Sequence, residues 1–367
     1  MSVVVAPDSF KGSASAAVVA SALGAGWSSV RTADRVVLAP MADGGEGTID
    51  AFAAAFPAAV KHPVRVLGPA GDDVDANWLM LPDGTAVVEL AETSGLGRMA
   101  RPMPFEAHTV GFGQAIAAAL DAGCGSLLLA IGGSASTDGG AGALIALGAR
   151  LEDGDGHGIS FGNRGLMDLR RADLSRVRPL PPGGARILSD VTSPLLGPSG
   201  AAAIFGPQKG ATAGDIPLLE RGLRRLADTL LAAGVAVSPE LPGSGAAGGA
   251  GYGLLAWGAR MTPGAAAVGD ALGLPVTIAS ADVVITGEGR YDAQSAAGKV
   301  PEYVADLAHD AGVRVLLAAG AIAAPIGGFA SSVALGDLAG STEAAIADPV
   351  RWAYAAGAAL AALAAGA

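Results

Sequence analysis

Acidic residues stand at the ends of several apolar segments of this chain, where an open α/β sheet would present them to a ligand. A carboxylate in such a place can accept the proton of a hydroxyl group or bind Mg²⁺ through its oxygens. Phosphoryl transfer to an alcohol needs both functions. The residues in question are Asp8, Asp43, Asp190, Glu288 and Asp292.

Phosphoryl transfer also needs cations that neutralise the transferred group. Lys11, Lys209, Arg290 and Lys299 lie in segments of the same kind. The structural alternative is that the acidic residues cap helices or form turns. We accept that alternative for Asp73, Asp75 and Asp83. For Asp8, Asp43 and Asp190 we favour a functional role, because each lies at the carboxyl end of a predicted strand.

Four glycine-rich segments could bind phosphate through backbone N–H groups, since glycine allows a close approach of the backbone. For any single segment an ordinary tight turn is at least as frequent, but several in one chain favour an anionic ligand. The segment 243–248 has the spacing Gly-x-Gly-x-x-Gly, yet no strand is predicted before it, so we reject a dinucleotide fold. The segments are 43–48, 132–140, 243–249 and 287–289.

The elements that must position these residues alternate between apolar strands and amphipathic helices, a pattern typical of parallel sheets. Two strands are predicted near the N-terminus and three near the C-terminus, enough for one five-stranded, flavodoxin-like sheet. We expect a helix capped by Ser13 or Ser15, and a C-terminal helix that restarts at Pro349. The predicted strands are 3–6, 35–39, 282–286, 313–318 and 331–335.

The middle of the chain predicts a different, mixed α/β domain, with an antiparallel hairpin around Pro82-Asp-Gly84. We therefore expect two different α/β domains. One is a discontinuous flavodoxin-like domain (1–60 plus 280–367), and the other is inserted (61–279). Ligands often bind between such domains, so we expect the active site in the cleft between them.

Composition narrows the function classes. The chain has 367 residues and a formal net charge of −11, without a Lys/Arg run, which argues against nucleic acid or a membrane surface as partner. A single cysteine, Cys124, excludes an intrachain disulfide and fits a reducing compartment. The N-terminus lacks the pattern of a signal peptide, so we expect a cytoplasmic protein. Composition leaves the oligomeric state open.

Several long segments resemble the signatures of the bacterial glycerate kinase family, type 1. They include Ala6-Pro-Asp-Ser-Phe-Lys-Gly12 and Pro40-Met-Ala-Asp-Gly-Gly-Glu-Gly-Thr48. The others are 131–142, 205–211, 245–249 and 285–292, with Gln294 and Gly298-Lys299. The segments occur in family order from residue 6 to about residue 300, and together they are highly specific.

The resemblance implies a kinase that uses ATP and Mg²⁺ to phosphorylate D-glycerate, with 2-phosphoglycerate as the usual product. It also implies a flavodoxin-like domain joined to a second α/β domain. A kinase for a related small sugar acid, or a non-catalytic nucleotide or metabolite sensor on the same scaffold, remains an alternative. One segment departs from the family pattern: Asp190-Val-Thr-Ser193-Pro-Leu195 has Ser where the family commonly has Asn.

These observations lead to the following assignments. The catalytic and substrate-binding candidates are Asp190, Lys11, Asp8, Asp43 and Arg290, with Asp190 first as proton acceptor or metal-positioning carboxylate. The candidates for the nucleotide are Gly132, Gly133, Ser134, Thr137, Asp138, Gly139, Lys209, Gly287 and Glu288. The candidates for Mg²⁺ are Asp190 and Asp292.

Overall fold

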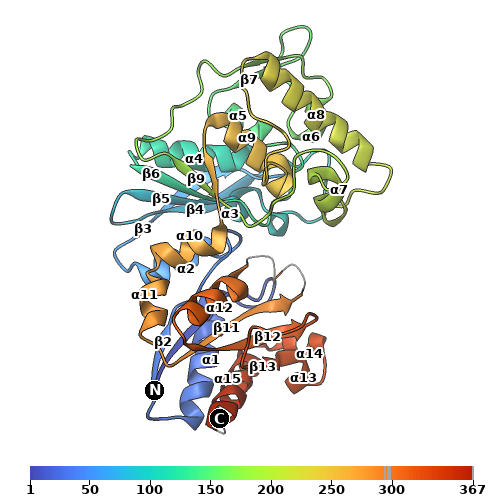
Figure 1. Ribbon diagram of the computed structural model, residues 1–367. Helices are drawn as coiled ribbons and strands as arrows, with labels where there is room; N and C mark the ends of the chain where they lie inside the picture. Colours follow the sequence, from blue (N-terminus) through green and yellow to red (C-terminus); the bar gives the residue numbers. More distant parts are fainter. Residues whose placement is uncertain (293–294, 296–298, 366–367) are drawn as a thin grey trace. The chain divides into compact units, whose positions relative to one another are not determined.

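Two sheets organise the chain, each within its own unit (Figure 1). The computed structural model describes residues 1–292, 295 and 299–365. Unit 1 comprises Met1–Asp43, Asp50–Pro57 and the chain from Pro263 onward, and unit 2 comprises Gly44–Ile49 and Ala58–Thr262.

Unit 1 is built on a five-stranded sheet in the order β13-β12-β11-β1-β2, and every pair is parallel. This confirms the predicted flavodoxin-like sheet. Strand β1 lies inside the sheet, between β11 and β2, and it is apolar and buried from Val3 to Pro7, as a strand covered on both faces requires. The strands are β1 (Ser2–Pro7), β2 (Arg35–Leu38), β11 (Val283–Tyr291), β12 (Arg314–Ile322) and β13 (Ser331–Ala334).

The helices of unit 1 follow the predicted pattern. Ser15 caps α1 by accepting from the backbone N–H of Val18, and the last helix restarts at Pro349. Figure 1 shows α1 beside α15, and the two helices contact each other. They approach so closely that a Cβ atom on Gly26 would lie 1.9 Å from the carbonyl oxygen of Tyr354, so only glycine fits there. The helices are α1 (Ala16–Val30), α2 (Thr48–Ala55), α10 (Gly264–Ala271), α11 (Leu274–Ala279), α12 (Val300–Asp310), α13 (Leu335–Ala339), α14 (Thr342–Ala347) and α15 (Pro349–Ala365).

Unit 1 resumes at Pro263, whereas the sequence places the boundary near residue 280. The difference consists of the short helices α10 and α11. Both contact α12, and α10 also hydrogen bonds it through the side chain of Asp270, whose Oδ1 accepts from the hydroxyl of Tyr303 at 3.1 Å. Helix packing therefore sets this boundary, and no composition change marks it.

Unit 2 contains a mixed six-stranded sheet in the order β10-β9-β6-β5-β4-β3. The pairs from β10 to β5 are parallel, and β5, β4 and β3 run antiparallel, which confirms the predicted hairpin. A separate antiparallel pair, β7 and β8, was not predicted. The strands are β3 (Val60–Leu67), β4 (Asp73–Met80), β5 (Thr85–Glu89), β6 (Ser126–Ala130), β7 (Arg150–Glu152), β8 (Arg171–Asp173), β9 (Ala185–Leu188) and β10 (Arg260–Thr262).

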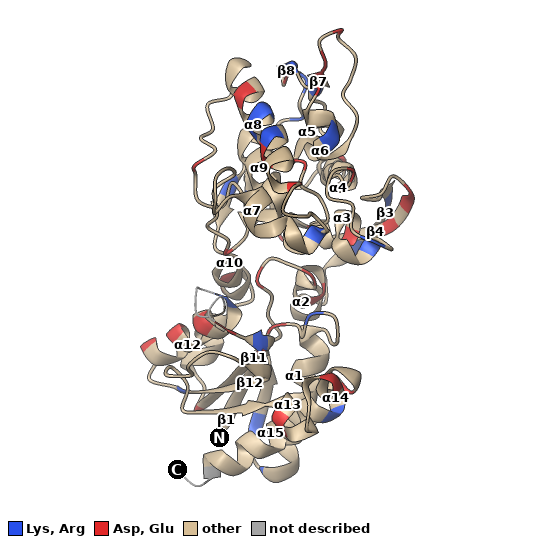
Figure 2. Ribbon diagram, turned by 90° about the vertical axis from the view of Figure 1, so that its right-hand side faces the viewer, with Lys and Arg blue, Asp and Glu red and all other residues tan. Residues whose placement is uncertain are grey.

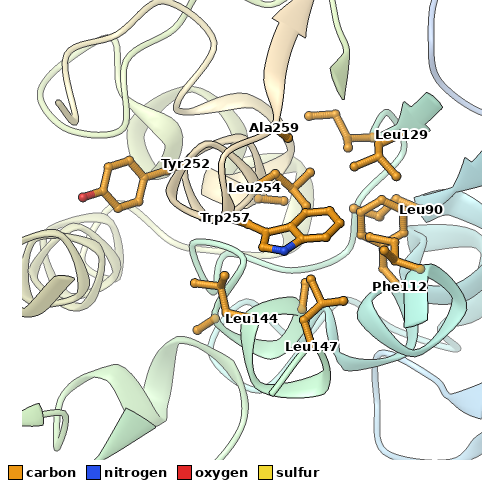
Figure 3. Close-up of a cluster of buried hydrophobic side chains, with 14 of the residues drawn as sticks. Leu90, Phe112, Leu129, Leu144, Leu147, Tyr252, Leu254, Trp257 and Ala259 are labelled. Carbon is orange, nitrogen blue, oxygen red and sulfur yellow. The ribbon is translucent and has the colours of Figure 1, made fainter. Parts of the chain in front are cut away.

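The core of unit 2 packs small and aliphatic side chains around a few large ones. Figure 3 shows the indole of Trp257 beside Leu254, with Leu144 and Leu147 below it and Phe112 to its right. The indole N–H donates to the carbonyl oxygen of Arg178 at 2.7 Å, so the ring is buried without losing a hydrogen bond. The helices, 3₁₀ turns included, are α3 (Leu90–Ser94), η1 (Leu96–Arg98), α4 (Val110–Asp121), α5 (Ala141–Ala146), α6 (Gly162–Leu166), α7 (Ala201–Phe205), η2 (Pro207–Lys209), α8 (Ile216–Ala232), η3 (Ala246–Gly249) and α9 (Ala250–Trp257).

Among the described residues, no helix is both long and apolar enough to span a bilayer.

Candidate active site

A pocket of about 360 Å³ opens in unit 1 at the carboxyl ends of β1, β11 and β12. The sheet order reverses beside β1, and doubly wound sheets bind ligands at such a switch point. Figure 2 shows blue and red segments close together around β11. The charged residues that line the pocket are Asp8, Lys11, Glu288, Arg290, Asp292 and Lys299.

Asp8 follows β1 directly, and its side chain is only 3% exposed. Its backbone N–H donates to the carbonyl oxygen of Gly287 at 2.8 Å, which ties the exit of β1 to β11. Its Oδ1 accepts from the backbone N–H of Ser9 at 2.7 Å. Burial, and then the neighbouring carboxylate of Asp43, raise the pKa of Asp8 well above its usual range. A proton acceptor of this kind operates closer to neutral pH than an ordinary carboxylate does.

Lys11 and Asp43 form an ion pair across the loops that follow β1 and β2, with Nζ 3.1 Å from Oδ2. Burial alone would lower the pKa of Lys11, but the carboxylates of Asp43 and Asp8 outweigh it and raise that pKa above the ordinary value. Lys11 therefore stays charged, and 56% of its side chain is exposed. The pair brings two predicted site residues, Lys11 and Asp43, together within unit 1.

The strand predicted at 282–286 is longer in the structure, because β11 continues through Tyr291 and remains paired with β12. A Cβ atom on Gly287 would lie 1.8 Å from the carbonyl oxygen of Ala318, so its glycine serves the close approach of two strands. Gly287 and Glu288 therefore lie within β11, and their backbone is paired with the neighbouring strand β12.

Glu288 is the most enclosed carboxyl group of the pocket after Asp8, with 6% exposure. Its Oε1 has no hydrogen-bond partner among the described residues. Burial raises the pKa of Glu288, and the nearby Ser295 hydroxyl and the cations of Lys299 and Lys11 partly offset that effect. A buried carboxyl oxygen without a partner is costly, so this atom is available to a ligand that enters the pocket.

Arg290 and Asp292 form the rim of the pocket on the side of β11. Nε of Arg290 lies 3.4 Å from Oδ2 of Asp292, and both side chains are partly exposed. Ser295 accepts from the backbone N–H of Asp292 at 3.0 Å. Gln294 and Gly298 of the sequence motif lie outside the described residues.

The glycine-rich segment 132–140 belongs to unit 2, and most of it faces the protein interior. Asp138 is fully buried and accepts from the backbone N–H and hydroxyl of Thr109, at 2.9 and 2.8 Å. It also accepts from the N–H groups of Gly140 and Gly142, at 3.1 and 3.2 Å. The carboxylate of Asp138 therefore holds the segment together internally.

Lys209 lies behind this segment and is 1% exposed. Its ammonium group donates to the hydroxyl of Ser134 at 3.2 Å and to the carbonyl oxygen of Ser136. Burial lowers the pKa of Lys209 to about 7, although Asp138 acts in the opposite direction. Lys209 therefore stabilises segment 132–140 from the buried side, through its hydrogen bonds to Ser134 and Ser136.

The segment's backbone donors are largely used as well. Gly132 and Gly139 donate to the carbonyl oxygens of Gly44 and Gly248, both at 3.1 Å. Ser134, Thr137, Asp138 and Gly139 are buried, whereas Gly132 is half-buried and Gly133 exposed. Of the residues predicted to bind phosphate in segment 132–140, only Gly132 and Gly133 therefore reach the surface of the described part of unit 2.

Asp190 lies in unit 2, two residues beyond β9, and its side chain is half-buried. The following segment is held by Gly245, whose N–H donates to the carbonyl oxygen of Ser193 at 2.9 Å. The structure brings Asp8, Lys11, Asp43, Glu288, Arg290 and Asp292 together in unit 1 and places Asp190 in unit 2.

Sequence reasoning missed Glu89, at the carboxyl end of β5. It is buried, and its two carboxylate oxygens accept from the backbone N–H groups of Gly47 and Ile49, each at 3.0 Å. Glu89 thereby fixes the glycine-rich loop that follows Asp43. The signal was present: a single glutamate ends an otherwise apolar strand, the same pattern that singled out Asp8.

The chain is similar to known proteins both in sequence and in fold. The model of the glycerate kinase family matches residues 3–365. The chain is 42% identical to glycerate 2-kinase of Escherichia coli (strain K12) over 89% of this chain and 87% of that protein. It is 41% identical to a glycerate kinase of Bacillus subtilis (strain 168), over 88% and 85%.

A crystal structure described as glycerate kinase 2 from Salmonella typhimurium LT2 superposes with a TM-score of 0.83 at 39% identity. The superposition covers 100% of this chain and 99% of the Salmonella chain. Both the sequence and the fold thus match over essentially the whole length, and the chain belongs to the glycerate kinase family.

Proposed function

We propose that this protein is a glycerate kinase that transfers the γ-phosphoryl group of ATP to a hydroxyl group of D-glycerate, with 2-phosphoglycerate as the product. The observation that carries the proposal is the pocket of unit 1. There, partly or fully buried carboxyl groups and three cations gather at the switch point of a parallel sheet. Anionic substrates need the cations, and the acceptor hydroxyl needs a base. The single cysteine, Cys124, supports a cytoplasmic location for this activity.

The reaction is an in-line attack of the glycerate oxygen on the γ-phosphorus, in which one O–P bond forms and the bond to the ADP oxygen breaks. Positioning and charge neutralisation supply most of the rate enhancement. Lys11 and Arg290 are proposed to bind the substrate carboxylate or the transferred phosphoryl group. Asp190 is proposed as the proton acceptor, and Asp8 is the alternative because its environment raises its pKa.

Mg²⁺ fits the acidic residues of the site. Carboxylate oxygens are its preferred protein ligands, and Glu288 offers a buried oxygen that no described residue satisfies. Asp292 lines the same pocket, and the like charges around Asp8 would be relieved by a divalent cation. We propose Asp292 and Glu288 as ligands in unit 1, with Asp190 as the candidate in unit 2. When bound, the ion would neutralise charge on the nucleotide phosphates.

A coupled assay of ADP release tests the proposal with D-glycerate, L-glycerate and a panel of small hydroxy acids and sugar acids, with and without Mg²⁺. We expect ADP formation that requires Mg²⁺ and D-glycerate. Preference for another sugar acid would identify a kinase with a different acceptor. Binding of ATP without turnover of any acceptor, by folded protein, would identify a sensor and overturn the kinase assignment. ³¹P NMR of the product distinguishes 2- from 3-phosphoglycerate.

A further inference from the structure

A second pocket, of about 780 Å³, adjoins the first within unit 1. The two pockets share Gly320, Ala321 and Thr342, so they meet at the carboxyl end of β12. The second pocket is bounded by the segment after β12 and by the turns around α13. It is far larger than a three-carbon acid requires and falls in the range of pockets that enclose larger organic ligands.

The two pockets differ in charge. Lys11, Arg290 and Lys299 line the first pocket, whereas none of the described residues that line the second is a lysine or arginine. Within the described part of the chain, Asp337 is the one charged residue that lines the second pocket. A carboxylate or phosphate group would therefore be held in the first pocket, and a neutral, polar part of a ligand fits the second.

The walls of the second pocket suit a nucleoside. Ile322, Pro325 and Ile326 supply an apolar surface on which the flat face of a base can pack. The carboxylate of Asp337 can accept from ribose hydroxyls, as acidic residues do in other doubly wound nucleotide-binding folds. The hydroxyl of Ser341 accepts from the N–H of Ala344 at 3.1 Å, and its proton stays available to a ligand.

We propose that these two pockets form one binding site for ATP, in which the second pocket holds the adenosine moiety and the first holds the phosphates. This inference rests on the proposed function for the identity of the nucleotide. It moves the nucleotide from the glycine-rich segment 132–140, where Thr137, Asp138 and Gly139 are buried, to the sheet of unit 1.

Two neighbouring alanines provide a matched pair of variants. Ala324 lines the second pocket and is half-buried, whereas Ala323 is exposed and does not line it. Ala324→Phe should fill the pocket, and Ala323→Phe adds the same bulk outside it. Asp337→Ala removes the proposed ribose contact, and Glu343→Ala removes an equal charge on the neighbouring helix, outside the pocket. Circular dichroism and melting curves establish that each variant is folded.

Calorimetry on the full chain measures binding of three probes: ADP, adenosine and inorganic tripolyphosphate, the phosphate-bearing probes with Mg²⁺. We expect Ala324→Phe and Asp337→Ala to weaken ADP and adenosine by about tenfold or more, on the scale of a lost directional contact, and to leave tripolyphosphate unchanged. Lys299→Met should weaken tripolyphosphate and spare adenosine. Ala323→Phe and Glu343→Ala should bind all three probes like the wild type.

Unchanged adenosine and ADP binding in both Ala324→Phe and Asp337→Ala overturns the nucleoside site. Equal weakening of tripolyphosphate by these variants overturns the division between the two pockets. The assay of ADP release separates these results from the proposed function. If the wild type phosphorylates glycerate and the variants bind ATP as tightly as the wild type does, only the proposed nucleoside site is refuted. If the variants weaken ADP binding as expected but the wild type phosphorylates no acceptor, only the proposed kinase activity is refuted.

Discussion

Nζ of Lys11 lies 3.1 Å from Oδ2 of Asp43, and this contact joins the loops that leave two neighbouring parallel strands. The chain brings a cation and a carboxylate together from positions 32 residues apart. Lys11 lines the pocket and 56% of its side chain is exposed, so it can hold its partner and still meet an anionic ligand.

Replacing Lys11 by methionine should lower kcat/KM for glycerate phosphorylation by roughly 10²-fold, because the pocket loses a cation that faces its anionic substrates. Lys11→Arg keeps the charge and should recover part of the activity. Steady-state kinetics with both substrates varied provides the measurement. An activity of Lys11→Met within threefold of the wild type would show that the pair with Asp43 is purely structural.

Asp8→Asn should stabilise the protein at neutral pH. A carboxyl group whose folded-state pKa is raised contributes its full stability below its ordinary pKa and loses it as pH rises through the raised value. The amide avoids this loss, so the melting temperature at pH 7 should rise. In a domain of this size, each ~1 kcal/mol gained in the free energy of unfolding raises it by roughly 2–4 °C. The gain should shrink toward pH 4. Scans of thermal unfolding between pH 4 and 8 measure it. A gain that is the same at every pH contradicts the titration of Asp8.

Much of the fold could be predicted, because apolar periodicity is a local signal. The strands at 3–6, 35–39 and 331–335 and the restart of the last helix at Pro349 were confirmed. The extension of β11 through Tyr291 could not be predicted, since its Gly-Glu-Gly segment has the composition of a turn. It becomes a strand in which Gly287 allows β12 to approach closely.

The candidate site was predictable in part for a similar reason. Asp8 and Asp43 follow strands and Glu288 lies in the last part of β11, and a parallel sheet brings the carboxyl ends of its strands to one edge. The enclosed position of Lys209 was not predictable, because a loop lysine normally points to solvent. Only the tertiary packing around Ser134 and Ser136 shows that its charged end is buried. The roles of all these residues stay predictions.

Lys209 provides a second pH test. A buried lysine with a pKa near 7 binds fewer protons than the same group in the unfolded chain, between about pH 7 and its ordinary pKa. The free energy of unfolding should therefore rise with pH across this interval, by up to ~1.4 kcal/mol per pH unit. Lys209→Met lacks this contribution, whereas Lys61→Met, at an exposed lysine of the same unit, retains it. Urea unfolding at pH 7, 8 and 9 gives the slopes, and equal slopes in the three proteins would refute the titration.

Ser193→Asn introduces the residue that the resemblance to the family leads us to expect at this position. The backbone at this position is already held by Gly245, so the larger side chain should change stability little. If the departure weakens substrate positioning, the variant should show a lower KM for glycerate, at least twofold, with kcat nearly unchanged. Initial-rate kinetics decides this, with Thr192→Asn at the neighbouring exposed position as the control. An unchanged or higher KM means that Ser193 is not a weakened substrate contact.

Asp190→Asn tests the first-ranked proton acceptor. The amide keeps the shape of the side chain but loses the negative charge and most of its basicity. If Asp190 accepts the hydroxyl proton or positions the metal, kcat should fall by roughly 10²-fold or more. The melting temperature should stay constant or rise, because groups retained for catalysis commonly cost stability. Asp190 is half-buried two residues beyond β9, so a role as a structural cap predicts the opposite pair of results: a clearly lower melting temperature with kcat within a few-fold of the wild type. In that case we would assign the role of proton acceptor to Asp8. Its carboxyl group lines the pocket of unit 1, and both burial and the carboxylate of Asp43 raise its pKa.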